Sequence, residues 1–164
     1  MKALITVASK HGATLGIAET IAGRLRAYGI GASLYPPATV TTLQGYDAVL
    51  LGSALYANRL MPAMGAFVAR WSHQLATLPT YVFVSGPLDS AGTDLIPVPK
   101  DVRDIARVIA ARRVRLFPGR MDFETLKPTE RAVMRMIGAK AGDYRDFSAI
   151  EDWADTLATE LLEE

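Results

Sequence analysis

Five short apolar runs, separated by longer segments with helical periodicity, constrain the fold of this chain more than any other feature. The runs are apolar throughout instead of alternating with polar residues, which predicts strands buried on both faces of a parallel sheet. They occupy residues 3–8, 32–35, 47–51, 81–84 and 114–117. Helical patterns cover residues 14–29, 63–75 and 102–109. This alternation predicts an α/β fold, a doubly wound five-stranded parallel sheet with helices on both faces.

The C-terminal part of the chain carries a further helix, preceded by an insert that a five-strand scheme does not need. Ser148 and Glu151 have the spacing of a capping box, which predicts the start of the last helix there. The insert covers residues 118–144, and Pro128 and Gly138 bracket a helical stretch within it. The apolar and basic residues of this stretch lie on opposite sides: Val133, Met134, Met136 and Ile137 against Arg131 and Arg135.

Length and composition narrow the class of protein. At 164 residues the chain fits one domain, so we expect residues 1–164 to form a single unit that contains the insert. The absence of cysteine excludes disulfides, thiolate metal sites and iron–sulfur clusters. The two histidines, His11 and His73, are not spaced as metal ligands, so we expect no bound metal. A net charge of +1 predicts no nucleic-acid partner.

The apolar runs also bear on location. None approaches the roughly 20 residues that span a bilayer, and the N-terminus lacks the layout of a signal peptide. We therefore expect a cytoplasmic protein, and peripheral contact with the inner face of the membrane stays compatible with the sequence. Nothing in the sequence indicates the oligomeric state.

The polar loop after the first apolar run is a candidate ligand site, because open α/β sheets bind ligands beyond the carboxyl ends of their strands. It consists of Ser9, Lys10, His11, Gly12, Ala13 and Thr14, and it runs directly into a helix. Hydroxyls, backbone N–H groups and the positive end of the helix dipole suit a phosphate there. The chain has neither G-x-x-x-x-G-K-[ST] nor G-x-G-x-x-G, which bind nucleoside triphosphates and dinucleotides.

The pattern S-x-x-G-x-T in this loop resembles the phosphate loop of flavodoxins, [ST]-x-T-G-x-T, with His11 in place of the usual middle threonine. The segment YDAVLLGSALYANR likewise resembles the third strand and following loop of flavodoxin-like proteins. This resemblance implies a flavodoxin-like fold with strand order 2-1-3-4-5. It also implies flavin mononucleotide (FMN) as cofactor, with its phosphate in the loop.

The same resemblance implies that the loops after the third and fourth strands hold the flavin ring. The residues it assigns to the cofactor are Ser53, Ala54, Leu55, Tyr56 and Ala57, and Ser85, Gly86, Pro87, Leu88 and Asp89. Tyr56 is the candidate for stacking, because its side chain offers the ring a flat apolar surface. Leu88 stands where flavodoxins often carry an aromatic residue, which indicates a more open or differently tuned flavin. We expect no catalytic side chain, since the flavin itself carries the redox chemistry.

Over nearly its full length the chain resembles the menaquinone-dependent protoporphyrinogen oxidases. The resemblance rests on M-K-A-L-I at the start, S-x-x-G-x-T, YDAVLLGSALY, M-R-M-I-G in the insert and D-W-A near the end. It implies an FMN-dependent oxidoreductase of heme biosynthesis that passes electrons from a porphyrinogen to a quinone. The insert would then contact substrate, quinone or membrane, although a methionine-rich helix face also suits ordinary core packing.

A flavodoxin-type electron carrier without a substrate of its own is the alternative, with a redox protein as its partner. Carrier flavodoxins as a family are strongly acidic, whereas this chain has a pI of about 8.0 and lacks that steering field. The sequence leaves open whether the protein is an enzyme or a carrier. A third outcome is a flavodoxin-like domain that has lost FMN and serves as an interaction module.

Overall fold

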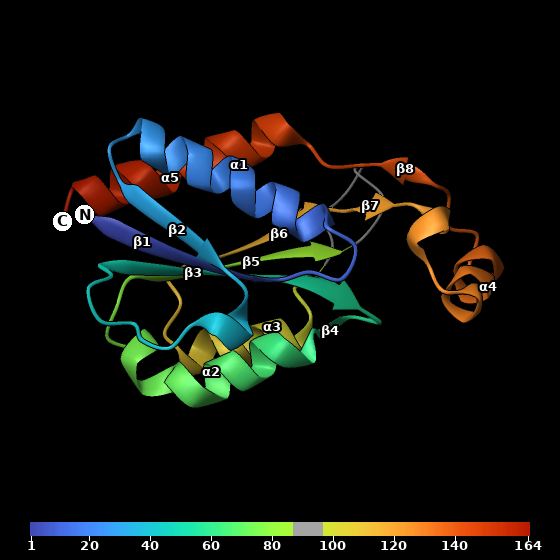
Figure 1. The fold of residues 1–164 in the computed structure, drawn as a ribbon, viewed down its shortest axis with the longest axis horizontal. Coiled ribbons are helices and arrows are strands. Elements are labelled where there is room, and N and C mark those ends of the chain that lie inside the picture. Colours follow the sequence, from blue (N-terminus) through green and yellow to red (C-terminus); the bar gives the residue numbers. More distant parts are fainter. Residues whose placement is uncertain (87–96) are drawn as a thin grey trace.

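The computed structural model describes residues 1–86 and 97–164, and Figure 1 shows a sheet between two layers of helices. Five parallel strands follow the order β2-β1-β3-β5-β6. Their bounds are Lys2–Ala8 (β1), Gly31–Tyr35 (β2), Ala48–Tyr56 (β3), Thr80–Gly86 (β5) and Arg113–Pro118 (β6). Counted as parallel strands alone, this is the order 2-1-3-4-5, so the predicted flavodoxin-like fold is confirmed. A short sixth strand, β4 (Arg59–Leu60), pairs antiparallel with β3.

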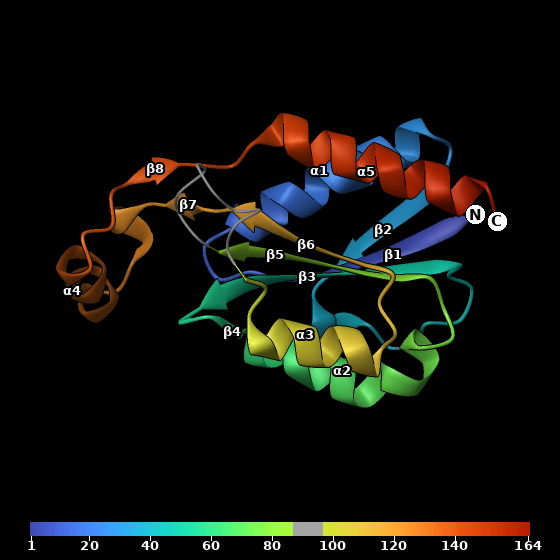
Figure 2. The same ribbon diagram turned by 180° about the vertical axis from the view of Figure 1, so that it is seen from behind.

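Helices cover both faces of the sheet, as Figures 1 and 2 show from opposite sides. One face carries α1 (Ala13–Ala27) and α5 (Phe147–Leu162), and the other carries α2 (Pro62–Leu75) and α3 (Lys100–Val108). Strand β1 serves both layers: Ile5 packs with the α1 and α5 side, and Leu4 packs with the α2 side. Burial of alternate residues on opposite faces is the reason that β1 is apolar throughout. A short 3-10 helix, η1 (Pro37–Thr39), follows β2.

One glycine in the third strand is set by packing. Gly52 of β3 lies beside Phe83 of β5, and a Cβ at position 52 would come within 2.6 Å of Cε2 of the Phe83 ring. The Phe83 side chain is fully buried and meets Trp153 of α5 edge to face, with ring centroids 6.1 Å apart. The absence of a side chain at Gly52 therefore leaves room for the buried Phe83 ring.

Two strands are longer than the sequence predicts. Strand β3 does not end at residue 51 but continues to Tyr56, and β5 continues to Gly86. The small residue Ser53 has no strong strand propensity, yet it is paired on both sides, with Ala8 of β1 and with Val84 of β5. Ladder hydrogen bonds from two neighbours override a weak local preference. The predicted loop after the third strand is therefore largely a strand end.

The start of the last helix differs from the predicted capping box. The N-cap of α5 is Asp146, whose carboxylate accepts a hydrogen bond of 3.1 Å from the backbone N–H of Ala149. Ser148 lies inside the first turn. Asp and Ser are both good N-cap residues, and the sequence offers two of them two residues apart.

The insert folds back on the carboxyl end of the sheet. It contains β7 (Arg120–Met121), a 3-10 helix η3 (Phe123–Thr125), α4 (Pro128–Met136) and β8 (Gly142–Asp143). Strands β7 and β8 pair antiparallel, with Arg120 opposite Asp143. We call residues 119–145 the strap. Helix α4 matches the predicted helical stretch and stands off the end of the sheet in Figures 1 and 2. Within the two described stretches, no helix is long and apolar enough to cross a membrane.

Candidate functional site

A cleft of about 660 Å³ opens at the carboxyl ends of the parallel strands, where the loop after β1, the ends of β3 and β5, and the strap meet. Ten of the residues predicted to bind the cofactor line it: Ser9, His11, Ala13, Thr14, Ala54, Leu55, Tyr56, Ala57, Ser85 and Gly86. The structure thus brings the three predicted segments to one place. The predicted residues Pro87, Leu88 and Asp89 lie outside the described residues.

Three predicted residues shape the cleft without lining it. Gly12 adopts a left-handed conformation with φ 82°, which only glycine accepts without strain, and its N–H donates to Ser9 Oγ at 3.1 Å. Lys10 is exposed and ion-paired to Glu130 of α4. Ser53 is buried; its hydroxyl accepts from the N–H of Met61 at 3.1 Å and donates to the carbonyl of Ala54 at 2.8 Å. Ser53 therefore stabilises the β3–β4 connection.

The first turn of α1, at the cleft, has no side-chain cap. Its N-cap is Gly12, which has no side chain to cap the first N–H groups, and the turn contains no acidic residue. Free N–H groups and the positive end of the helix dipole attract an anion there. This arrangement suits the phosphate predicted from the sequence.

The Thr14 side chain is the most informative part of this turn. Thr14 is fully buried and lines the cleft, yet its Oγ1 has no hydrogen-bond partner anywhere in residues 1–86 and 97–164. Nε2 of His11, which also lines the cleft, is a second buried polar atom without a hydrogen-bond partner among the described residues. An unsatisfied buried hydroxyl costs roughly 1–3 kcal/mol. Two such atoms beside one helix N-terminus fit a bound group that is rich in hydrogen-bond acceptors, as a phosphate is.

Tyr56 forms the wall of the cleft at the end of β3. Its ring meets the His11 ring edge to face, with centroids 6.3 Å apart, and Nζ of Lys10 lies 5.4 Å from the Tyr56 centroid. The side chain is 36% exposed, which leaves one surface for a planar ligand. Burial raises the pKa of the Tyr56 phenol, and the negative charge of Glu130 raises it further, so the phenol is neutral at physiological pH.

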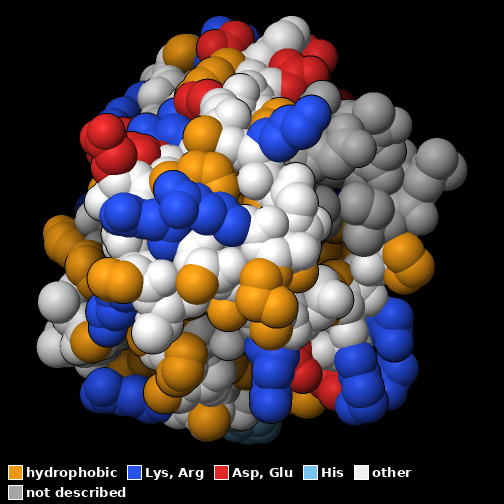
Figure 3. All heavy atoms as spheres, turned by 90° about the vertical axis from the view of Figure 1, so that its right-hand side faces the viewer, with side chains coloured by type: hydrophobic (Ala, Val, Ile, Leu, Met, Phe, Trp, Pro, Cys, Tyr) orange, Lys and Arg blue, Asp and Glu red, His pale blue; other side chains and the backbone are white. Residues whose placement is uncertain are grey.

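The strap supplies the remaining side of the cleft, which lies outside the three segments predicted to bind the cofactor. Its lining residues are Gly119, Arg120, Met121, Asp122, Thr125, Leu126, Thr129, Glu130, Val133, Met134 and Ile137. Figure 3 views this end of the molecule and shows apolar side chains intermingled with Lys and Arg. Val133 of α4 and Ile137, the C-cap of that helix, are 52% and 69% exposed, so this end of the molecule presents apolar side chains at the surface. The methionine-rich pattern of the insert pointed to this helix, but no local pattern pointed to Arg120.

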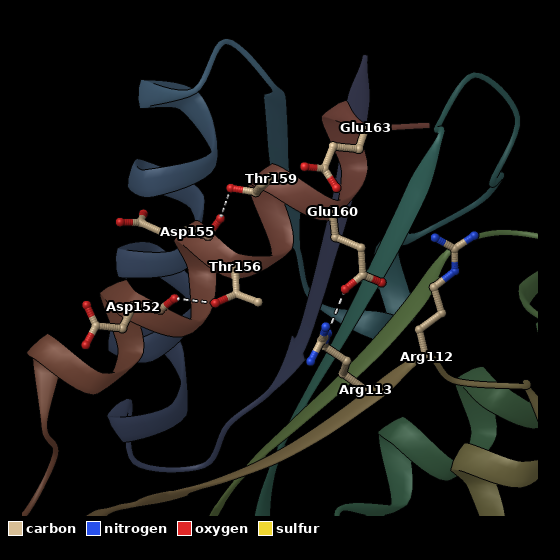
Figure 4. Close-up of a pocket in the computed structure, with 8 residues that line it drawn as sticks. All are labelled: Arg112, Arg113, Asp152, Asp155, Thr156, Thr159, Glu160 and Glu163. Carbon is tan, nitrogen blue, oxygen red and sulfur yellow. Dashed lines mark hydrogen bonds and ion pairs between the residues drawn. The ribbon is translucent and has the colours of Figure 1, made fainter.

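A second depression, of about 640 Å³, lies between α5 and the edge strand β6 (Figure 4). Its polar groups are largely paired with one another: Arg113 Nε donates to Glu160 Oε2 at 2.6 Å, and the Thr156 hydroxyl donates to the carbonyl of Asp152 at 2.9 Å. It is distant from the carboxyl ends of the strands. Because these groups already have partners, the depression offers a ligand less than the cleft beside Thr14.

A doubly wound parallel sheet of this strand order defines the flavodoxin-like class of α/β proteins. The chain belongs to the flavodoxin domain family, because the family model described as "Flavodoxin domain" matches residues 4–148. The match begins within β1 and ends at the start of α5, so it includes the strap. No curated protein sequence matches the chain.

Solved structures resemble the whole chain at low sequence identity. A flavodoxin from the domain Archaea is 16% identical, with a TM-score of 0.65 over 98% of this chain and 99% of that one. A cysteine-to-serine mutant of the flavodoxin from Pseudomonas aeruginosa is 20% identical, with a TM-score of 0.62 over 98% and 99%. The rubredoxin oxygen:oxidoreductase from Desulfovibrio gigas is 14% identical, with a TM-score of 0.67 over 99% of this chain and 36% of that one.

These similarities bear on the fold and not on the substrate. They show a flavodoxin-like fold, in agreement with the family match. None of them points to the protoporphyrinogen oxidases, so that resemblance rests on the sequence motifs alone.

Proposed function

We propose that this chain is an FMN-binding redox protein that holds the flavin phosphate in the loop of residues 9–14. The observation that carries the proposal is the Thr14 hydroxyl, buried at the N-terminus of α1 on the cleft wall and without a partner in residues 1–86 and 97–164. Ser9, Gly12 and Thr14 would donate hydroxyl and backbone hydrogen bonds to the phosphate oxygens. His11 would take the place of the missing threonine hydroxyl through its Nε2.

The flavin ring would lie beside Tyr56, between the β3–β4 turn and the end of β5. Support comes from the shape of this region: Ala57 and Asn58 turn the chain with φ angles of 48° and 61°, which leaves Tyr56 at the edge of the cleft. Ser85 and Gly86, at the end of the neighbouring strand, also line the cleft, and Pro87, Leu88 and Asp89 follow them in the predicted ring-binding loop. When bound, FMN supplies the uptake and release of electrons, and these residues orient it.

We further propose that the protein is an FMN-dependent oxidoreductase that takes two electrons and two protons from a porphyrinogen and delivers them to a quinone. Besides the sequence motifs, apolar residues of α4 and its C-cap support this, because Val133, Met134 and Ile137 line the same cleft as Tyr56. A hydrophobic quinone or a large planar porphyrinogen suits such a wall. The mixture of apolar and basic side chains on this face also suits peripheral contact with an anionic membrane (Figure 3).

An electron carrier is the second candidate. It is favoured by family membership and by the near-complete overlap with two flavodoxins that are themselves about as long as this chain. Against it stands the formal charge of +1, which gives no strong field to steer a partner protein.

The decisive first experiment is the visible spectrum of the purified protein, followed by release and identification of the chromophore. A colourless protein that takes up no added FMN would refute the proposal and favour an interaction module. The flavin-loaded protein is then mixed anaerobically with protoporphyrinogen, and afterwards with a quinone. Reduction in the first step and reoxidation in the second support the oxidoreductase. A flavin that stays oxidised with protoporphyrinogen but accepts electrons from a redox protein identifies a carrier.

A further inference from the structure

We propose that Arg120 of the strap is the cationic partner of the phosphate group, and that it makes the cleft select a phosphorylated flavin over riboflavin. The inference rests on the proposed FMN site and adds to it a residue from outside the three predicted segments. Arg120 lines the same cleft as Ser9, His11 and Thr14.

The position of the guanidinium carries the proposal. Nη2 of Arg120 donates a hydrogen bond of 3.1 Å to the carbonyl of His11, in the middle of the phosphate loop. The same nitrogen lies 3.8 Å from the point that a Cβ on Gly12 would occupy. One N–H of the Arg120 guanidinium therefore holds the side chain against the loop. The remaining N–H groups of the guanidinium stay available for an anion.

Arg145, at the other end of the strap, provides a contrast. It also donates to a carbonyl of the loop region, that of Ala13, at 3.3 Å. Its charge, however, is already matched by Asp143, which accepts from both Nε and Nη2 at 2.9 and 2.7 Å. Arg120 has no ion-pair partner within residues 1–86 and 97–164. Of the two arginines that donate to this loop region, Arg120 is therefore the one whose positive charge could pair with an anionic ligand.

Three of the four acidic residues of the strap accept hydrogen bonds from donors other than Arg120. Asp122 accepts from the N–H of Glu124 at 2.9 Å. Glu130 is bonded to Lys10 and to the N–H of Lys127. Asp143 lies opposite Arg120 in the β7–β8 pair and feels its charge, but its two oxygens are held by Arg145. An incoming dianion could therefore pair with Arg120 without breaking an ion pair among the described residues.

The Arg120 guanidinium would add to the site an interaction that the loop itself lacks. Hydroxyls and backbone N–H groups bind a phosphate by hydrogen bonds alone, whereas a guanidinium adds charge and can donate two parallel bonds to phosphate oxygens. In this loop His11 stands where flavodoxins have a hydroxyl, so one contact to the phosphate changes character. Arg120 reaches the loop from the opposite wall of the cleft at that same residue, His11.

The test compares FMN with riboflavin, which lacks the phosphate. Dissociation constants of the full-length protein are measured by quenching of flavin fluorescence at low and high salt. Arg120→Met is expected to weaken FMN binding about tenfold and to leave riboflavin binding unchanged, since a charge-assisted hydrogen bond to phosphate is lost. The salt dependence of FMN binding should fall with it. Arg120→Lys should recover part of the affinity.

Arg135→Met is the matched control, because Arg135 is an exposed cation of the same strap that does not line the cleft. It should change the affinity for neither flavin. Equal weakening of FMN and riboflavin by Arg120→Met, or no weakening of either, would overturn the assignment.

A second measurement separates this inference from the proposed function. Inorganic phosphate should raise the Tm of the flavin-free wild-type protein and have little effect on Arg120→Met. If the wild type takes up no flavin but shows this phosphate response, the FMN proposal fails and the anion site at Arg120 stands. If phosphate stabilises both proteins equally or neither, Arg120 is not the cationic partner.

Discussion

Lys10 and Glu130 form an ion pair that joins the loop before α1 to the first turn of α4, 120 positions further along the chain. Glu130 also accepts a hydrogen bond of 3.0 Å from the backbone N–H of Lys127, so the same carboxylate fixes the start of α4. The pKa of Glu130 is lowered first by the hydrogen bond from Lys10 and then by that from Lys127. One acidic group thus connects the two sides of the cleft.

The attachment of the strap should weaken in acid. A carboxylate with a lowered pKa in the folded protein stabilises it fully above its ordinary pKa, 4.5 for Glu130, and loses that contribution as the pH falls through the lowered value. Asp143 behaves in the same way, since the hydrogen bond from Arg145 lowers its pKa. Hydrogen exchange in α4, corrected for the intrinsic rate, should therefore be less protected at pH 3.5 than at pH 6. In Glu130→Gln the difference in protection between the two pH values should shrink. Equal protection of α4 at both pH values in the wild-type protein would contradict the prediction.

Thr14→Val should change stability and FMN affinity in opposite directions. In the flavin-free protein the substitution removes a buried hydroxyl without a partner in the described residues, so the free energy of unfolding should rise by about 1 kcal/mol. FMN binding should weaken by roughly 1.5–3 kcal/mol, the size of a hydrogen bond to a charged group. Denaturant unfolding and flavin titration measure the two effects.

Thr6→Val is the control for that pair of measurements. Thr6 is equally buried in β1, and its Oγ1 also lacks a partner among the described residues, but it does not line the cleft. It should stabilise the protein and leave FMN affinity unchanged. An FMN affinity that is the same in Thr14→Val and in the wild type would remove Thr14 from the phosphate site.

Tyr56→Ala should weaken FMN and riboflavin alike, by about 0.5–1.5 kcal/mol, the usual size of an aromatic pair. The reason is that Tyr56 would contact the ring, which the two flavins share, and not the phosphate. Tyr56→Phe should retain most of the affinity because the phenol is neutral and the ring surface is kept. A loss restricted to FMN would indicate that Tyr56 acts on the phosphate loop through His11, its edge-to-face neighbour.

Gly52→Ala should destabilise the fold by about 1–3 kcal/mol, because the new methyl group would collide with the buried Phe83 ring. Gly23→Ala in α1 is the matched control, since an added Cβ there meets nothing within 4 Å and alanine favours a helix. It should stabilise the protein by about 0.5–1 kcal/mol. Urea unfolding of the two variants measures both effects, and a neutral Gly52→Ala would show that Phe83 can move aside.

The sequence predicts the sheet well because strands buried on both faces are apolar at nearly every position. Ile5 and Leu4 serve opposite helical layers from one strand, so the run that contains them cannot alternate with polar residues. The ends of strands are less visible. Ser53 belongs to β3 because both β1 and β5 pair with it, and Ala54 because β5 pairs with it, and that information lies elsewhere in the chain.

Only part of the candidate site could be predicted from the sequence, because only part of it forms a local pattern. The hydroxyls and glycine of residues 9–14 are consecutive and precede a helix, so their pattern is local. Arg120 meets His11 across 109 positions, and no periodicity relates them. The hypothesis for residues 118–144 correctly gave a helix there, but the return of the strap over the phosphate loop depends on tertiary contacts such as Lys10–Glu130.

The strap is not part of the packed core of the protein. Among the described residues, neither core cluster includes a member of the strap, because α5 packs on α1 through residues beyond it. The free energy of closing a longer connection grows slowly, by about 0.6 kcal/mol for each doubling of its length. A change in the length or sequence of the β6–α5 connection should therefore cost the core little stability. The cleft wall that the strap supplies could thus change while residues 9–14 and the ends of β3 and β5 keep their positions.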